Sequence, residues 1–290
     1  MAASSVFVTA PDGLKLHVRE YGPRNSGRPA VVCLPGLTRT AEDFDALALA
    51  LAARGRRVLA LDSRGRGRSD YDHDPDNYTL PTELADLMGV LTACEAEPAV
   101  FVGSSRGGLL TMLLAAQRPM AIAGAILNDI GPVIEPKGLM RIKGYVGKLP
   151  TPRNYEEGRE ILRRLFGHQF PNLDDAAWEA FAGRSWRKEN GRMLVTYDVN
   201  LAHTLKGFDA DSPIPPLWPQ FDALSRVPVM LVHGALSDIL SAETVAAMAD
   251  RCRRMEVIEV ADQGHTPLLS GDAIVSRLTT FIERCDAQAA

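Results

Sequence analysis

Short apolar runs recur along the chain, and each is bounded by turn residues. The five clearest runs span Ala30–Leu34, Val58–Leu61, Ala99–Val102, Ala123–Leu127 and Val227–Val232, and a weaker sixth spans Met255–Val260. None of them alternates apolar with polar positions, which is the pattern of a strand buried on both faces. We therefore predict a mostly parallel sheet that is covered by helices on both sides.

Helix-like segments separate these runs. They span Ala41–Arg54, Pro81–Cys94, Gly107–Arg118 and Ala242–Cys252. Strands that alternate with helices predict a doubly wound α/β fold. The N-terminal part differs, because the alternating segments Ser5–Thr9 and Leu14–Glu20 flank a Pro-Asp-Gly turn. This pattern predicts an antiparallel hairpin at the edge of the sheet.

The alternation of predicted strands and helices stops between about Ile130 and Phe221. Helix-like sequence persists there, at Tyr155–Phe166 and Asp174–Arg184. We predict that residues 131–220 form a helical cap, or lid, inserted into an α/β core made of residues 1–130 and 221–290.

The predicted cap carries several large aromatic side chains, namely Tyr145, Phe170, Trp178 and Trp186. Side chains of this kind can line an apolar pocket, or they can fill the small core that a cap needs for itself. For most of the four we favour the second interpretation.

Composition argues against several classes of partner. The formal net charge is −4, the isoelectric point is near 5.9, and charges of both signs are mixed along the chain. No basic face for nucleic acid is therefore expected, and no apolar run approaches the ~20 residues of a membrane helix. The first residues do not resemble a signal peptide. We expect a soluble, cytoplasmic protein that acts on a small molecule, without nucleic-acid or membrane partners.

The four cysteines show neither CxxC spacing nor grouping with histidines. No pattern typical of a metal site or of a phosphate-binding glycine loop is present in the sequence. We therefore expect chemistry that needs no metal and no organic cofactor.

The sharpest chemical signal is Gly103-Ser104-Ser105-Arg106-Gly107, which fits G-x-S-x-G. It follows an apolar run and precedes helix-like sequence, the context in which this motif presents a nucleophilic serine on a tight turn. We predict that Ser105 is the nucleophile. The developing oxyanion needs N–H donors, and we assign the backbone N–H groups of Arg106 and Leu37.

A serine nucleophile needs a base, and the base needs an acid. Of the six histidines, His265 lies in a loop just after the last predicted strand, at the edge where open α/β sheets place their sites. We predict that His265 is the general base. Asp238 also follows a strand end and is our choice for the acid, and Asp129 remains open as the alternative.

Taken together, these residues resemble the serine-nucleophile branch of the α/β-hydrolase superfamily, over nearly the whole chain. The resemblance rests on Leu34–Leu37, Leu61–Ser69, Gly103–Gly107, Ser237-Asp238 and Gly264-His265. It implies an eight-stranded sheet with a helical cap after the sixth strand, and an esterase or lactonase activity. More narrowly, the chain is similar to bacterial proteins described as enol-lactone hydrolase-like.

The reaction we expect is hydrolysis of a carboxylic ester or lactone through an acyl-enzyme on Ser105. Hydrolysis of a C–C bond and cofactor-free haloperoxidase-like chemistry stay open on the same triad, as does a small-molecule receptor without catalysis. The side chain of Arg106 raises a separate question. Because a buried guanidinium needs a partner, Arg106 either pairs with a carboxylate beneath the site or holds an acidic group of the substrate.

Overall fold

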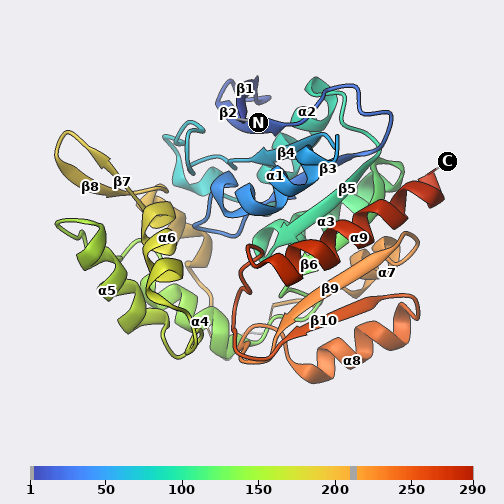
Figure 1. Cartoon of the computed structure of the whole chain (residues 1–290). Coiled ribbons are helices and arrows are strands. Elements are labelled where there is room, and N and C mark those ends of the chain that lie inside the picture. The colour runs from blue at the N-terminus through green and yellow to red at the C-terminus, as the bar shows by residue number, and fades with distance from the viewer. Residues whose placement is uncertain (1–2, 210–213, 290) are drawn as a thin grey trace.

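The computed structural model of the 290-residue chain describes residues 3–209 and 214–289. Eight strands in these residues form one sheet, in the order β1-β2-β4-β3-β5-β6-β9-β10 (Figure 1). Their bounds, in chain order, are β1 (Ser4–Thr9), β2 (Lys15–Tyr21), β3 (Ala30–Leu34), β4 (Val58–Leu61), β5 (Ala99–Ser104), β6 (Ile122–Asn128), β9 (Val229–Gly234) and β10 (Glu256–Val260). The strands from β4 to β10 pair in parallel, whereas β1 and β2 form the antiparallel hairpin expected at the sheet edge.

Helices cover both faces of this sheet (Figure 1). On one face α1 (Asp45–Ala53) packs beside α9 (Asp272–Ala289). On the other, α3 (Arg106–Gln117) packs against α2 (Leu80–Ala93) and α7 (Trp218–Leu224). The remaining helices of the core are α8 (Ala242–Arg251) and the short 3₁₀ helices η1 (Ala41–Phe44), η2 (Pro75–Asn77) and η3 (Pro119–Ala121).

The side chains of the central strands divide between the two faces. In β3, Val31 and Cys33 belong to the apolar cluster under α1 and α9. Val32 and Leu34 belong to the cluster under α2 and α3. Because both sets are buried, a central strand has no position at which water would favour a polar side chain. This explains why the sequence of these runs shows no alternation.

The chain leaves the sheet after β6 and returns to it at β9, after a long insertion. The elements of this insertion are α4 (Pro136–Tyr145), α5 (Tyr155–Phe166), α6 (Asp175–Ser185), β7 (Trp186–Glu189), β8 (Arg192–Val195) and the 3₁₀ helix η4 (Val199–Leu205). Figure 1 shows α4, α5, α6 and the β7–β8 hairpin gathered on one side of the molecule. The insertion is thus not wholly helical, because β7 and β8 pair as an antiparallel hairpin that the sequence pattern did not reveal.

The insertion has a small apolar core of its own, which contains Trp178 and Trp186. Both tryptophans are almost fully buried.

Among the described residues no helix is both long and apolar enough to cross a membrane.

Candidate active site

Ser105 stands on a strained turn between β5 and α3. Its φ of +49° lies in the left-handed region, which is costly for any residue other than glycine. The flanking glycines make this turn possible. A Cβ on Gly107 would lie 2.1 Å from the carbonyl oxygen of Leu34, and a Cβ on Gly103 would lie 2.6 Å from the backbone of Gly107. Only glycine fits at either position, as the G-x-S-x-G pattern requires.

His265 reaches Ser105 from the loop between β10 and α9. Its Nε2 atom lies 2.8 Å from Ser105 Oγ, within hydrogen-bond distance. The imidazole is nearly buried, with 5% of the side chain exposed. The structure therefore brings together the two residues that the sequence analysis assigned as nucleophile and base.

The other ring nitrogen of His265 faces Asp129. Asp129 Oδ2 lies 2.8 Å from Nδ1 and also accepts a hydrogen bond from Ser237 Oγ at 2.6 Å. Oδ1 accepts the backbone N–H of Gly234 at 2.8 Å. Every oxygen of this fully buried carboxylate is thus hydrogen-bonded. A carboxylate held in this way fixes the tautomer of the imidazole and stabilises its cation.

Asp238, our first choice for the acid, contacts a different residue. Both of its oxygens accept from Arg141 in α4, at 2.6 Å from Nε and 2.7 Å from Nη2. Burial acts to raise the pKa of Asp238, but the Arg141 ion pair outweighs it and holds that pKa below its usual range. The assignment of Asp238 as the partner of His265 was therefore wrong, and the alternative residue Asp129 takes that position.

The register of the strands explains why Asp129, and not Asp238, faces His265. In the β5–β6 pairing Ser104 lies opposite Asn128, so Ser105 and Asp129 are each the first residue beyond two neighbouring strands. Asp238 lies four residues beyond the end of β9, far enough for its side chain to turn toward the insertion. There its backbone also borders Gly138, where an added Cβ would lie 2.3 Å from the Asp238 carbonyl oxygen.

Gln169, a buried residue between α5 and α6, was not predicted from the sequence as part of the site. Its side-chain Oε1 accepts the backbone N–H of His265 at 2.9 Å, and its carbonyl oxygen accepts the N–H of Gly264 at 2.7 Å. The insertion thereby holds the loop that carries His265. Nothing in the sequence around a single glutamine indicates this contact.

The two backbone donors assigned to the oxyanion lie beside Ser105. Leu37 lines the same pocket as Ser105, and a Cβ on Gly36 would lie 3.7 Å from Ser105 Cβ. Arg106 follows Ser105 at the first position of α3, where a helical N–H has no partner within its own helix. In the described part of the chain neither N–H donates to a protein group. Both donors are therefore available to a bound oxygen.

The side chain of Arg106 points away from this pocket. Its Nε donates to Glu83 at 2.7 Å, and Glu83 also accepts from Arg66 at 2.7 Å. Burial acts to raise the pKa of Glu83, but its two arginine partners hold that pKa below the ordinary value, so it is an anion at neutral pH. Of our two expectations for Arg106, the structure thus supports pairing with a carboxylate beneath the site.

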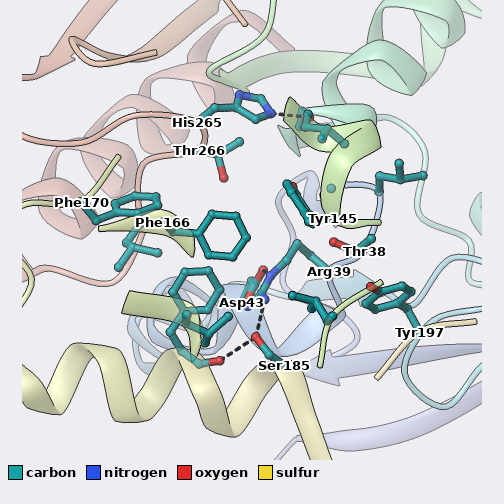
Figure 2. Close-up of a pocket in the computed structure, with 18 residues that line it drawn as sticks. Thr38, Arg39, Asp43, Tyr145, Phe166, Phe170, Ser185, Tyr197, His265 and Thr266 are labelled. Atoms are coloured by element: carbon teal, nitrogen blue, oxygen red, sulfur yellow. Dashed lines mark hydrogen bonds and ion pairs between the residues drawn. The ribbon is translucent and has the colours of Figure 1, made fainter. Parts of the chain in front are cut away.

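Ser105 and His265 line a pocket whose other walls come from the core and from the insertion, and Figure 2 shows this pocket. Most of its lining is apolar, and half of the lining residues come from the insertion, including Phe166, Phe170 and Tyr145. Its volume is about 100 Å³. Of the four aromatic residues singled out in the sequence, Phe170 and Tyr145 line this pocket, whereas Trp178 and Trp186 pack inside the insertion.

No group of three His, Cys, Asp or Glu side chains in residues 3–209 and 214–289 is placed to hold a metal ion. The arrangement that is present consists of a serine, a histidine and an aspartate joined by hydrogen bonds, with N–H donors beside the serine. Such a set of groups can perform nucleophilic acyl transfer.

The chain is similar to known hydrolases over nearly its whole length. A curated relative, the 3-hydroxybutyrate-oligomer hydrolase of Cupriavidus necator, is 32% identical over 291 residues, which cover 94% of each chain. The crystal structure of an alpha/beta hydrolase from Novosphingobium aromaticivorans is 40% identical, covers 98% of this chain and 99% of its own, and superposes with a TM-score of 0.91.

More distant structures share the fold. The E-2-(acetamidomethylene)succinate hydrolase is 22% identical, with a TM-score of 0.80 over 97% of this chain and 99% of its own. The family model described as "Alpha/beta hydrolase family" matches residues 31–277, which is most of the chain. The sheet, the turn at Ser105 and these matches agree with one another. The chain therefore belongs to the alpha/beta hydrolase family and is a hydrolase.

Proposed function

We propose that this protein is a serine hydrolase that cleaves a carboxylic ester of a small molecule through an acyl-enzyme on Ser105. The observation that carries the proposal is the continuous hydrogen-bonded chain from Ser105 Oγ through His265 to Asp129, with 2.8 Å at each step. Of these residues, Ser105 and His265 line a mostly apolar pocket.

The mechanism follows from the position of each group. Ser105 Oγ attacks the ester carbonyl carbon while His265 Nε2 takes the hydroxyl proton, and Asp129 stabilises the resulting imidazolium. The N–H groups of Leu37 and Arg106 donate to the oxyanion. When the tetrahedral intermediate collapses, the alkoxide leaves with the proton from His265. Water, activated by the same imidazole, then attacks the acyl-enzyme and releases the acid and free Ser105.

The mostly apolar lining of the pocket and the similarity to a 3-hydroxybutyrate-oligomer hydrolase favour short hydroxyacid esters as substrates. A lactone is an internal ester of the same acids, so lactones belong to the same substrate class. We expect hydrolysis of linear 3-hydroxybutyrate trimer and of short p-nitrophenyl esters.

The test compares Ser105→Ala with Ser104→Ala, a matched control one residue earlier. Ser104 Oγ accepts from Asn128 Nδ2 at 2.9 Å and does not line the pocket of Ser105. We expect Ser105→Ala to lower kcat by roughly 10⁶-fold, and Ser104→Ala to keep most of the activity. A fluorophosphonate probe should label Ser105 in the wild type, as read by peptide mass spectrometry. Equal activity in wild type and Ser105→Ala would refute the proposal.

A further inference from the structure

Arg39 places a guanidinium in the pocket that contains Ser105. Arg39 lies in the loop after β3, and Gly36 lies between the aliphatic part of its side chain and Ser105. A Cβ on Gly36 would lie 3.5 Å from Arg39 Cγ and 3.7 Å from Ser105 Cβ. Figure 2 shows the Arg39 side chain in the pocket, pointing toward Asp43 and Ser185. A cation therefore lines the same, otherwise largely apolar, cavity as the proposed nucleophile.

The partners of Arg39 leave part of its donor capacity free. Nε and Nη2 donate to Asp43 at 2.7 Å and 2.6 Å, and Nη1 donates to Ser185 Oγ at 3.0 Å. A guanidinium has five N–H groups. Within the described chain, two of them remain for another acceptor. The ring of Phe181 lies 4.6 Å from the guanidinium carbon, so an acceptor has to approach in the plane of the group.

In the immediate ion-pair cluster of Arg39, one positive charge is left over. Asp43 is shared, because Arg184 Nε also donates to it at 3.0 Å. Burial acts to raise the pKa of Asp43, but Arg39 and Arg184 hold that pKa below its usual range, so Asp43 is an anion at neutral pH. Two guanidinium groups thus face one carboxylate. Among the described residues that line the pocket, Asp43 is the only carboxylate.

Two further acidic residues, Glu42 and Asp45, act on this cluster from outside the pocket and pair with another arginine. Glu42 accepts from Arg19 Nη1 at 2.9 Å and Asp45 from Arg19 Nη2 at 3.1 Å, and both contacts are partly solvent-exposed. Neither side chain lines the pocket. An arginine that lines a mostly apolar pocket and has free in-plane N–H groups suits a carboxylate.

We propose that Arg39 binds a carboxylate of the substrate, so that the enzyme prefers esters whose acyl or alcohol part ends in a free acid. This inference rests on the proposed function of the same site. It narrows the substrate class from short hydroxyacid esters in general to anionic ones. The free-acid end of a linear hydroxyacid oligomer has this chemistry, and its methyl ester lacks it.

The test uses these two compounds as a matched pair, linear 3-hydroxybutyrate trimer and the same trimer with its carboxyl end methylated. For Arg39→Gln we expect kcat/KM for the free acid to fall roughly 10- to 100-fold, the loss typical of one charge-assisted contact. The methylated trimer should change less than about threefold. Asp43 keeps Arg184 as a partner in this variant, so no unpaired carboxylate is created.

Arg184→Gln is the matched control, because Arg184 contacts the same Asp43 but does not line the pocket. If Arg39 only fastens the insertion to the core, both variants should affect the two trimers equally. That outcome, or a wild type that does not distinguish the free acid from its methyl ester, would overturn the inference while leaving ester hydrolysis at Ser105 intact.

A binding measurement separates the inference from the proposed function. By titration calorimetry, Ser105→Ala should bind the free acid at least tenfold more tightly than the methylated trimer. The double variant with Arg39→Gln should lose this preference. The preference does not depend on turnover, so it can be read even if the protein hydrolyses neither compound. Equal binding of both trimers by Ser105→Ala would contradict the role of Arg39.

Discussion

The Nδ1 atom of His265 lies 2.8 Å from Oδ2 of Asp129, a residue 136 positions earlier in the chain. Asp129 has a positive φ of 54° and is fully buried, so its backbone is strained and its charge is removed from water. Hydrogen bonds from Ser237 and Gly234 hold the carboxylate in this position. The acid that faces the histidine therefore comes from the end of β6, whereas Asp238 after β9 fastens α4 to the core.

The first prediction separates these two aspartates by activity. Asp129→Asn should lower kcat by roughly 10⁴-fold, because an amide no longer selects the imidazole tautomer that can accept the serine proton. Asp238→Asn should keep kcat within about tenfold of the wild type, since Asp238 makes its hydrogen bonds with Arg141 instead. Steady-state rates on a short p-nitrophenyl ester measure both. A larger loss at Asp238 would refute the assignment.

The second prediction concerns stability and pH. The pKa of Asp238 is lowered in the folded protein despite burial, so the Arg141 ion pair stabilises the fold above the unfolded pKa of about 3.9. This contribution is lost as the pH falls through the lower folded pKa. At pH 7, Asp238→Asn should lower the free energy of unfolding by about 1–2 kcal/mol, allowing for partial solvent screening.

Urea unfolding at pH 7 and at several values below pH 4 checks this. The difference between wild type and Asp238→Asn should shrink on acidification, and Arg141→Met should show the same pH dependence. A difference that stays constant from pH 7 to pH 3 would mean that the ion pair does not contribute in this way.

The third prediction compares two glycines of the same helix, α4. A Cβ on Gly138 would lie 2.3 Å from the carbonyl oxygen of Asp238, whereas nothing lies within 4 Å of a Cβ on Gly144. Gly138→Ala should therefore push α4 away from the core and destabilise the protein by about 1–3 kcal/mol. Gly144→Ala should be neutral or stabilise by up to about 1 kcal/mol, because alanine favours a helix. Thermal unfolding of the two variants measures this difference in stability. Equal changes in stability would contradict the predicted close packing of Gly138 against Asp238.

The fourth prediction concerns Gln169. Gln169→Met keeps the size of the side chain but removes the acceptor for the backbone N–H of His265. We expect kcat to fall about tenfold with little change in KM, because the imidazole is less well oriented while the pocket is intact.

Gln263→Met is the control for Gln169. Gln263 Oε1 accepts a comparable bond, from the N–H of Leu268 at 2.7 Å in the same loop. Both variants should lose similar stability, since each leaves one backbone N–H without its partner. Only Gln169→Met should lower kcat markedly. Equal kcat values in the two variants would show that Gln169 has no special effect on His265.

Much of the architecture could be predicted from local sequence. The segments predicted as strands and helices of the core agree with the structure to within a few residues, as for the helix predicted at Gly107–Arg118 and found at Arg106–Gln117. The reason is that a short apolar run bounded by turn residues, and the helix-like sequence between two such runs, can each be recognised within one segment. The β7–β8 hairpin left no such mark, because its strands are only four residues long and mostly polar or exposed.

What the sequence by itself determined is the set of reacting groups on short motifs: Ser105 between two glycines that no other residue can replace, and His265 in a loop after the last strand. What only the tertiary structure decided is which groups meet. The choice between Asp129 and Asp238 depends on the register of β5 against β6 and on the ion pair of Asp238 with Arg141 from the insertion. The hydrogen bonds of Gln169 and Arg39 also join the insertion to the core. Such contacts join residues about 100 or more positions apart, so no local pattern in the chain encodes them.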